Sequence, residues 1–357
     1  MTIAKLARPE IRVLKPYAAA SQIDATIRLN ANEAPWTSRA DRFRRPLNRY
    51  PEIRPARLRW ALADRYGCGE ENLLVTRGTS EGIDLLLRVF CRAGQDSMLI
   101  IAPTFSMYRH YAAVQGARVI EVETSGHDDF AVDIDALLKS CDATTRLIFI
   151  CSPNNPTGTS MPRDNLLRLL DVRGDRSAIV VDEAYIEFAR EPSMVGLLHS
   201  YSNLIVLRTL SKALAYAGAR CGSVIGPAAV IDMLDAVQAP YAMATPVVEC
   251  VENALQAENL NEAEQRVSDI VAERDRLVAA IDRFSFVRKI WSSAANFFLI
   301  EVDNVEALLE QCVADKILLR YFGGSLADCI RITVGSTAEN DRLLQSFESV
   351  LNTSISS

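Results

Sequence analysis

Long apolar runs are missing from this sequence, and no stretch approaches the roughly 18 residues that a membrane-spanning helix needs. Histidine is scarce, with three residues, and none lies near cysteines at the spacing of a zinc site. The eight cysteines are scattered and form no C-x-x-C pair, which favours buried free thiols in a reducing compartment over a disulfide framework. We therefore expect no membrane span, no structural metal and no disulfides.

An excess of basic residues is also missing, because 45 acidic residues outnumber 39 basic ones and give a net charge of −6. This balance argues against a dedicated nucleic-acid binder. The first 17 residues carry charges throughout and contain no continuous apolar segment, so we expect no signal peptide. Together these features predict a cytoplasmic protein.

Arginine is concentrated between residues 39 and 59, where only Asp41 and Glu52 oppose it. The stretch contains Arg39, Arg42, Arg44, Arg45, Arg49, Arg54, Arg57 and Arg59. These arginines would form either an anion-attracting surface or a solvated face, and we favour a solvated face for most of them.

What the chain does contain is typical of a globular protein with a substantial core, with 49% hydrophobic and 24% charged residues. From Asn72 onward, short apolar segments alternate with helical ones, which predicts an α/β fold with a mostly parallel seven-stranded sheet. The expected strands cover residues 72–76, 97–101, 118–122, 146–151, 178–188, 203–207 and 221–226. Their near-continuous hydrophobicity predicts strands that are covered on both faces.

Past about residue 245 the pattern changes, and residues 261–284 predict a long amphipathic helix. Further expected elements are strands at 296–302 and 329–335 around a helix at 305–316. We therefore predict a large domain of residues 30–245. Residues 246–357, together with residues 1–29, are predicted to form a smaller α+β domain.

The segment from Ile205 to Gly222 begins as an apolar strand, breaks at Thr209-Leu210-Ser211 and then presents Lys212. A lysine at the end of a buried strand can act as a nucleophile, because desolvation lowers its pKa. A lone lysine after a strand is more often a surface charge, so the candidate depends on its neighbours.

The ends of two other expected strands supply such neighbours. Asp182 lies inside an apolar run, where an unpaired carboxylate is costly, so it needs a cationic partner, which an ordinary arginine ion pair could also provide. The phenol of Tyr185 and the amide of Asn155 can both donate hydrogen bonds to an oxyanion. Ligands of parallel sheets bind beyond the carboxyl ends of the strands, where these three residues are expected.

A phosphate site is expected nearby. At Arg77–Gly82 a glycine turn meets a helix N-terminus, whose free N–H groups can bind phosphate, although many helix starts share this pattern. Ser211 and Arg220 add a hydroxyl and a guanidinium. A ligand that matches all these groups is an aromatic phosphate with an aldehyde, a phenolic oxygen and a protonatable ring nitrogen. Pyridoxal 5'-phosphate has those groups.

At these motifs the sequence resembles the fold-type I aminotransferases. The matching segments are LNANE (29–33), LNRYP (47–51), RGTSEGIDLL (77–86), APTFSMY (102–108), SPNNPTG (152–158), VDEAYIEF (181–188), RTLSKALAYAGARCG (208–222) and CIRITVG (329–335). They occur in order over almost the whole chain. SPNNPTG and the lysine segment are specific for the fold, whereas LNRYP, DEAYIEF and RITVG indicate the histidinol-phosphate aminotransferase subfamily.

The resemblance implies roles for the cofactor-binding residues. Lys212 would carry the cofactor and shuttle a proton, Asp182 would pair with the ring nitrogen, and Asn155 and Tyr185 would hydrogen-bond the ring's 3-oxygen. The remaining contacts would come from Thr79, Ser80, Ser211 and Arg220 at the phosphate, from Phe105 on the ring face and from Tyr50 of a neighbouring subunit. Many relatives have tyrosine where this chain has Phe105. The reach of Tyr50 implies a homodimer with shared sites.

For the substrate, the resemblance points to Arg331, Arg320 and Tyr17, together with Asn155. Two arginines suit a phosphate in one half-reaction and a dicarboxylate in the other. The segment after Arg320 is short and contains glycine, so the assignment of Arg320 is weaker than that of Arg331.

The implied activity is transfer of an amino group between L-histidinol phosphate and 2-oxoglutarate, forming imidazole-acetol phosphate and glutamate, in histidine biosynthesis. An aromatic amino-acid aminotransferase or a threonine-phosphate decarboxylase could use the same scaffold. A non-catalytic effector domain of a transcription regulator would need a basic DNA-binding module, which we do not expect before Asn30.

Overall fold

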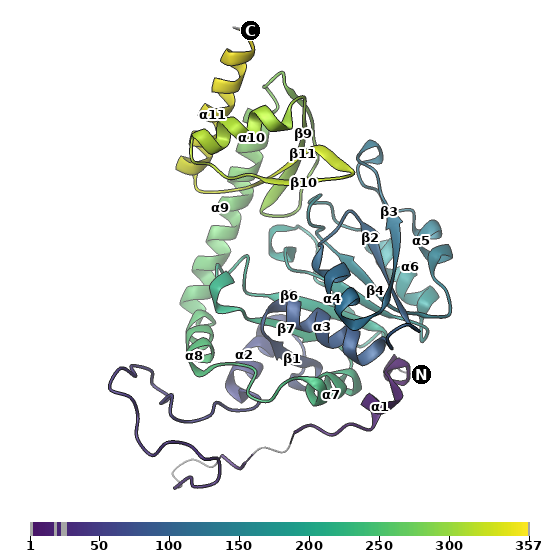
Figure 1. The fold of residues 1–357 in the computed structure, drawn as a ribbon, viewed down its shortest axis with the longest axis vertical. Coiled ribbons are helices and arrows are strands. Elements are labelled where there is room, and N and C mark those ends of the chain that lie inside the picture. Colours follow the sequence, from purple (N-terminus) through teal and green to yellow (C-terminus); the bar gives the residue numbers. More distant parts are fainter. Residues whose placement is uncertain (1–2, 18–19, 23–26, 356–357) are drawn as a thin grey trace.

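The computed structural model describes residues 3–17, 20–22 and 27–355, which form two β-sheets with helices packed around them (Figure 1). The larger sheet has the strand order β1-β7-β6-β5-β4-β2-β3, and the smaller sheet has the order β10-β11-β9-β8. The strands of the larger sheet are β1 (Leu73–Thr76), β2 (Ser97–Ala102), β3 (Arg118–Glu123), β4 (Thr145–Cys151), β5 (Ala178–Asp182), β6 (Leu204–Thr209) and β7 (Gly222–Ile225).

The larger sheet is mostly parallel, which confirms the predicted α/β class. β2 pairs in parallel with β3 and β4, and the parallel pairing continues from β4 to β5 and from β5 to β6. β7 runs antiparallel to both β6 and β1. β5 is shorter than the predicted strand at 178–188, because the Asp182 carboxylate accepts a hydrogen bond from the Ala184 N–H and the backbone turns there.

Helices cover both faces of the larger sheet. They are α2 (Ala56–Tyr66), α3 (Gly78–Phe90), α4 (Met107–Gln115), α5 (Ile134–Ser140), α6 (Arg163–Arg173), α7 (Ala228–Val237) and α8 (Thr245–Ala254). One face packs against α2, α5, α6 and α8, and the other against α3, α4 and α7. The central strands are therefore buried on both sides, as predicted. β3 differs, because it lies at the sheet edge and exposes part of its residues.

The N-terminal residues pack on the larger sheet's helices, which differs from the expectation that they join the smaller unit. Ile3, in a 3-10 helix at Ile3–Leu6, is fully buried in the same core as α3 and α7. The Arg8 N–H, which precedes α1 (Pro9–Arg12), donates to the Val89 carbonyl at 2.9 Å. A short apolar segment does not reveal in the sequence which core it joins, and the burial of Ile3 places it with the larger sheet. The division into two domains otherwise stays a prediction.

The smaller sheet and its helices form the C-terminal part. They comprise α9 (Ala257–Ile281), β8 (Val287–Ile290), β9 (Phe297–Val302), α10 (Val305–Ala314), β10 (Arg320–Gly323), β11 (Leu326–Thr333) and α11 (Thr337–Ile355). The long helix α9 runs from α8 to the smaller sheet (Figure 1). β8 and β10 were not predicted, because they leave most of their residues partly or fully exposed and so lack a strong apolar pattern.

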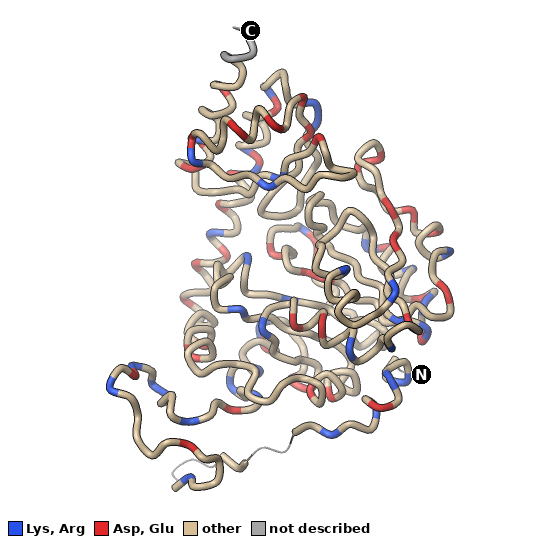
Figure 2. The backbone as a smooth tube through the Cα atoms, viewed as in Figure 1, with Lys and Arg blue, Asp and Glu red and all other residues tan. Residues whose placement is uncertain are grey.

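Between α1 and α2 the chain runs out along the lower edge of the molecule (Figure 1), and we call residues 13–17, 20–22 and 27–55 the arm. Its basic residues are visible in Figure 2. Several are not simply solvated, since Arg44 and Arg45 pair with Glu252 of α8, and Arg54 pairs with Asp235 of α7. The sequence interpretation missed these pairs because the carboxylates lie about 180 or more residues away.

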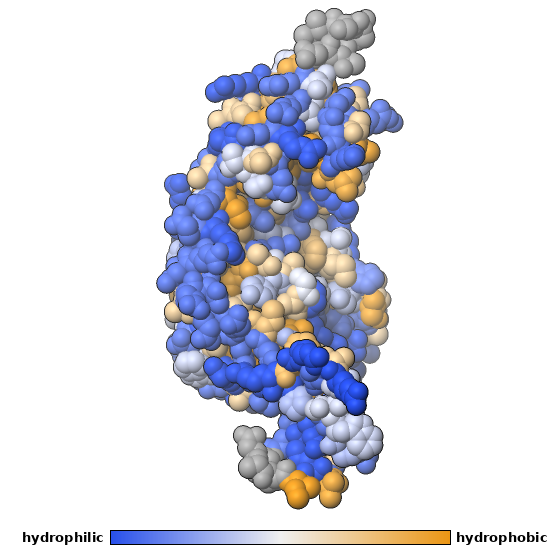
Figure 3. Space-filling view, turned by 90° about the vertical axis from the view of Figure 1, so that its left-hand side faces the viewer, coloured by the Kyte–Doolittle hydropathy of each residue, from blue (hydrophilic) through white to orange (hydrophobic). Residues whose placement is uncertain are grey.

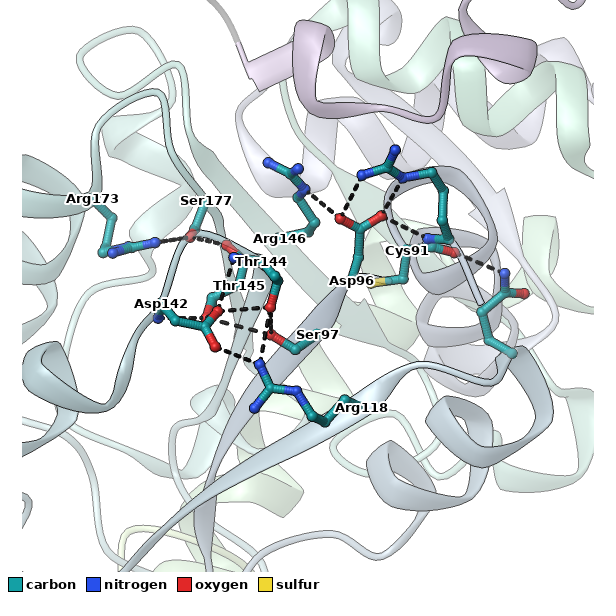
Figure 4. A network of polar contacts seen from close by, with 12 residues as sticks. Cys91, Asp96, Ser97, Arg118, Asp142, Thr144, Thr145, Arg146, Arg173 and Ser177 are labelled. Atoms are coloured by element: carbon teal, nitrogen blue, oxygen red, sulfur yellow. Dashed lines mark hydrogen bonds and ion pairs between the residues drawn. The ribbon is translucent and has the colours of Figure 1, made fainter. Parts of the chain in front are cut away.

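A network of hydrogen bonds and ion pairs connects the amino ends of β2 and β4 (Figure 4). Asp96, just before β2, is 2% exposed and accepts hydrogen bonds from Arg92 at 2.7 Å and from Arg146 of β4 at 2.9 Å. Burial alone would raise the pKa of the Asp96 carboxyl, yet the hydrogen bonds from these arginines lower it from 3.8 to about 2. The network therefore fixes the strand ends that lie farthest from the sheet's carboxyl edge.

We expect Asp96→Asn to lower the free energy of unfolding at pH 7 by about 2 kcal/mol, because the folded state loses a carboxylate whose pKa is depressed. This stabilisation is present above about pH 4 and is lost as the pH falls toward 2, so the two proteins should converge in acid. Urea unfolding at pH 7 and pH 3 measures it. Asp175→Asn, on an exposed pair with Lys5, is the control. An equal deficit at both pH values would contradict the role of the charge.

Candidate active site

A cavity of about 860 Å³ lies where the carboxyl ends of the larger sheet's strands face β10 and β11. Its lining includes most of the predicted site residues: Thr79, Ser80, Phe105, Asn155, Asp182, Tyr185, Ser211, Lys212, Arg220, Arg320 and Arg331. Figure 3 shows the hollowed surface between the upper and lower parts of the molecule. The structure thus brings eleven predicted residues, which are spread over some 250 positions of sequence, to one cavity.

Lys212 follows β6 after a tight turn, in which the Ser211 N–H donates to the Thr209 hydroxyl at 3.1 Å. The lysine side chain is accessible from the cavity, and its Nζ lies 5.6 Å from the centre of the Tyr185 ring. Partial burial lowers the pKa of the Lys212 amine, and the nearby Arg331 and Arg220 lower it further. A larger fraction of this amine is therefore neutral and nucleophilic than for an ordinary lysine.

Asp182 ends β5 and is 2% exposed. Its Oδ2 accepts a hydrogen bond of 2.8 Å from the Tyr108 hydroxyl, and its Oδ1 accepts one of 3.2 Å from the Ala184 N–H. Burial raises the pKa of this carboxyl to about 6, although both hydrogen bonds and the charge of Lys212 oppose the shift. At pH 7 the group is still mostly ionised, so it offers a desolvated negative charge to a cation in the cavity.

Asn155 and Tyr185 place two donors side by side. Both side chains are buried, and the Asn155 amide nitrogen lies 3.4 Å from the Tyr185 hydroxyl. The other end of the Asn155 amide accepts a hydrogen bond from Nη1 of Arg331. The arginine of the smaller sheet is therefore tied directly to the donors of the larger sheet.

The first turn of α3 is open toward the cavity. Its N-cap residue, Arg77, makes no side-chain capping hydrogen bond, so the first N–H groups of the helix lack a side-chain acceptor there. Gly78 has φ 74°, and a Cβ built on it would lie 2.5 Å from Nη2 of Arg220. A Cβ on Gly222 would lie 2.9 Å from the Thr79 nitrogen. The two glycines therefore allow Arg220 and β7 to approach the start of the helix.

A hydroxyl and a guanidinium complete this end of the cavity. Thr209 Oγ1 donates to Ser211 Oγ at 2.9 Å, and Nη1 of Arg220 donates to the same Ser211 oxygen at 3.4 Å. A helix N-terminus, a serine hydroxyl and an arginine together form a typical phosphate site. Thr209 was not predicted, because a threonine at the end of a strand carries no distinct sequence signal.

The smaller sheet contributes a pair of arginines. Arg320 of β10 and Arg331 of β11 are directly opposite each other in the antiparallel register. Like charges at opposite positions destabilise a sheet unless an anion or another group compensates them. The Phe322 ring lies near both, 5.2 Å from Cζ of Arg320 and 5.4 Å from Cζ of Arg331. Nε of Arg331 is buried and has no hydrogen-bond partner in the described part of the chain. The pair therefore suits an anionic ligand.

Tyr50 and Tyr17 do not reach this cavity. Both lie on the arm, where Tyr17 is 61% exposed and Tyr50 is half exposed and stacks on Tyr241 with ring centres 4.8 Å apart. A contact between these tyrosines and a cavity would need a second copy of the chain. Their predicted roles stay predictions.

Other lining residues were missed at the sequence level. They include Thr104, Arg109, Glu123, Thr124, Phe322 and the hairpin residues 323–326. Tyr108, which binds Asp182 from behind, was missed as well. Threonines, surface charges and a helical tyrosine are ordinary at such positions, so only the three-dimensional arrangement singles them out.

The residues present fit a flat ring that bears a phosphate. The phosphate site at α3 and Arg220 lies at one end, the buried Asp182 carboxylate suits a protonated ring nitrogen, and Phe105 offers an aromatic face. Lys212 supplies an amine that can react with an aldehyde on the ring. These are the groups that pyridoxal phosphate requires.

Comparisons with known proteins agree with this reading of the cavity. The model of the family "Aminotransferase class I and II" matches residues 26–347. A histidinol-phosphate aminotransferase of Xylella fastidiosa (strain 9a5c) is 42% identical over 351 residues, which cover 96% of this chain and 95% of that protein.

Two solved structures show the same fold. The histidinol-phosphate aminotransferase of Clostridium acetobutylicum has a TM-score of 0.78 at 24% identity, and the match covers 86% of this chain and 92% of that one. The one from Sinorhizobium meliloti, in complex with pyridoxal-5'-phosphate, has a TM-score of 0.78 at 23% identity, over 86% of this chain and 84% of that one. With the family match and the sequence identity over almost the whole length, the chain belongs to the class I and II aminotransferases and, within them, to the histidinol-phosphate aminotransferases.

Proposed function

We propose that the protein transfers an amino group between L-histidinol phosphate and 2-oxoglutarate, with pyridoxal phosphate as cofactor, in histidine biosynthesis. The observation that carries the proposal is the pair Arg320 and Arg331, which lines the same cavity as the Lys212 amine. Both substrates are anions, and the planar forks of the two guanidinium groups suit phosphate as well as carboxylate oxygens. Family membership supports the same activity.

The chain's own residues would hold the cofactor in a fixed arrangement. Thr79, Ser80, Ser211 and Arg220 would bind its phosphate, Phe105 would cover its ring, and Asp182, Asn155 and Tyr185 would bind its ring nitrogen and 3-oxygen. When bound, pyridoxal phosphate supplies an electron sink for the bond that breaks at the substrate carbon. The negative charge of Asp182, buried at the end of β5, favours a protonated ring nitrogen.

Lys212 would perform the proton transfers. Its amine is accessible from the cavity and has a lowered pKa, so at neutral pH its Nζ can accept a proton from the amine-bearing carbon of the substrate and later return it. Arg331 and Arg320 would bind the substrate anion, and Asn155, tied to Arg331, would couple its position to that of the cofactor. The same site would take histidinol phosphate and 2-oxoglutarate in turn, in a ping-pong sequence.

We further propose a cytoplasmic homodimer with shared active sites. The arm projects from the body of the molecule (Figure 1) and carries exposed apolar side chains, among them Tyr17, Leu29, Trp36 and Tyr50. Exposed apolar side chains that are gathered on one segment are typical of a protein interface. Within the described part of the chain, no helix is long and apolar enough to cross a membrane.

We expect subunits of Lys212→Ala and Tyr50→Ala to restore activity when they are mixed, although each variant alone has little. A hybrid dimer would combine Lys212 of one subunit with Tyr50 of the other in one intact site. Random exchange gives hybrids in about half of the dimers, so activity should return to about a quarter of the wild-type value. The assay is turnover of histidinol phosphate before and after subunit exchange. A mixture as inactive as its components would contradict shared sites.

The substrate is tested by comparing kcat/KM for histidinol phosphate, phenylalanine and threonine phosphate, each with 2-oxoglutarate. We expect histidinol phosphate to be preferred by at least roughly tenfold. Unlike phenylalanine, it provides the phosphate that the two arginines suit, and unlike the substrate of a decarboxylase it loses no carbon atom in the reaction. A preference for phenylalanine would instead assign an aromatic aminotransferase. Release of carbon dioxide from threonine phosphate would assign a decarboxylase.

A further inference from the structure

Tyr108 lies behind the cavity on α4, and its side chain is fully buried. The ring stacks on Phe149 of β4 with centres 5.0 Å apart and meets Phe105 edge-on at 5.7 Å. Its hydroxyl donates a hydrogen bond of 2.8 Å to Oδ2 of Asp182. One buried side chain therefore contacts both the carboxylate and the aromatic ring that line the cavity.

The two oxygens of Asp182 are held from different directions. Oδ1 accepts from the Ala184 N–H, which belongs to the loop after β5, whereas Oδ2 accepts from Tyr108 on a separate helix. The terminal torsion of an aspartate has a broad energy profile, so one hydrogen bond leaves the carboxylate plane free to turn. The second hydrogen bond, from Tyr108, fixes that plane relative to the cavity.

We propose that Tyr108 is a positioning residue for amino transfer, which holds the Asp182 carboxylate in the orientation that binds the ring nitrogen of the cofactor. The inference deepens the proposed function and rests on it only for the identity of the cofactor. A merely structural tyrosine would need some partner for its buried hydroxyl, but that partner need not be the carboxylate that lines the cavity.

The titratable groups that face Asp182 come from four elements. They are Tyr108 on α4, Cys151 on β4, Tyr185 after β5 and Lys212 after β6. Burial raises the pKa of Cys151, Tyr108 and Tyr185, so these three groups are neutral at pH 7. Lys212 is the one group of the four whose protonated form is a cation.

The hydrogen bond from Tyr108 therefore has a measurable electrostatic effect. Burial raises the pKa of Asp182 to about 6, and this hydrogen bond comes first among the interactions that lower it, ahead of the Ala184 N–H and the Lys212 charge. Without the hydroxyl, the carboxyl should protonate closer to neutral pH. It would then hold a cationic ring nitrogen less well at pH 7.

The test is Tyr108→Phe, which keeps the ring between Phe149 and Phe105 and removes only the donor. In the cofactor-free protein, infrared difference spectra follow the carboxyl band, which is assigned by its absence in Asp182→Asn. We expect the midpoint of this titration to rise by roughly one pH unit. We also expect the affinity for pyridoxal phosphate to fall about tenfold at pH 7 and less at pH 9, where the carboxyl is ionised in both proteins.

Tyr111→Phe is the matched control, because it removes a phenol from the same helix that does not contact Asp182, and it should leave both readouts unchanged. Adding Tyr108→Phe to Asp182→Asn should cause no further loss of affinity. An unchanged carboxyl midpoint, or an equal loss of affinity in the Asp182→Asn background, would overturn the inference. If the wild-type protein binds no pyridoxal phosphate, the proposed function fails, and the infrared midpoint still decides the role of Tyr108.

Discussion

Lys212→Ala loses turnover of histidinol phosphate by at least roughly 10⁴-fold, because no other amine lines the cavity in the described part of the chain. The fold should be unaffected, since the Lys212 side chain is exposed to the cavity and is not one of the buried core residues. Steady-state kinetics gives the first quantity, and thermal unfolding gives the second.

Lys212→Arg separates nucleophilic chemistry from charge. A guanidinium keeps the positive charge but does not give up its proton at neutral pH, so this variant should be as inactive as Lys212→Ala. Lys139→Ala, on the exposed surface of α5, is the control for loss of a lysine and should retain full activity. Substantial turnover by Lys212→Arg would show that the position supplies only charge.

Arg331→Leu lowers kcat/KM for histidinol phosphate by roughly 100-fold or more, because an anion in a partly buried site loses a charged hydrogen-bond donor. The substitution also frees the Asn155 amide, which the guanidinium now holds. Arg331→Lys should recover only part of the loss, since an ammonium cannot form the two parallel hydrogen bonds of a guanidinium. The measurement is kcat/KM for each substrate separately.

Arg331→Leu should lower kcat/KM for both histidinol phosphate and 2-oxoglutarate, because the same arginine pair would bind both substrates. Arg283→Leu, which removes an exposed arginine after α9, is the control and should leave both values unchanged. If only 2-oxoglutarate is affected, the phosphate of the other substrate must bind elsewhere.

The sequence was sufficient for the architecture of the larger sheet because its strands are buried on both faces. Segments such as β4 and β6 are therefore nearly continuous apolar runs, which are easy to recognise. β8 and β10 carry no such run, since much of their surface is exposed. β8 pairs with β9 and β10 pairs with β11, and no local sequence pattern indicates such contacts between strands.

The residues of the candidate site also differ in how far the sequence could predict them. Lys212 and Asp182 could be predicted because a charged residue in or after an apolar strand conflicts with burial, and that conflict is visible in one sequence. Tyr108 gave no such signal, because a tyrosine among apolar residues of a helix satisfies the usual rules for a core position. The position of Ile3 against α3 and α7 was missed for a related reason, since a short apolar segment does not reveal which core it joins.

The central claim is that the Lys212 cavity holds pyridoxal phosphate and takes the amino group of histidinol phosphate. The most direct measurement adds histidinol phosphate alone, without 2-oxoglutarate, to the cofactor-loaded protein and follows its visible absorbance. We predict that histidinol phosphate removes the visible absorbance, and that the size of this loss is proportional to the number of protein chains in the sample. Addition of 2-oxoglutarate should then restore the absorbance. Lys212→Ala should show neither change. The claim would be contradicted if the absorbance stayed constant after addition of histidinol phosphate, or if it changed with phenylalanine but not with histidinol phosphate.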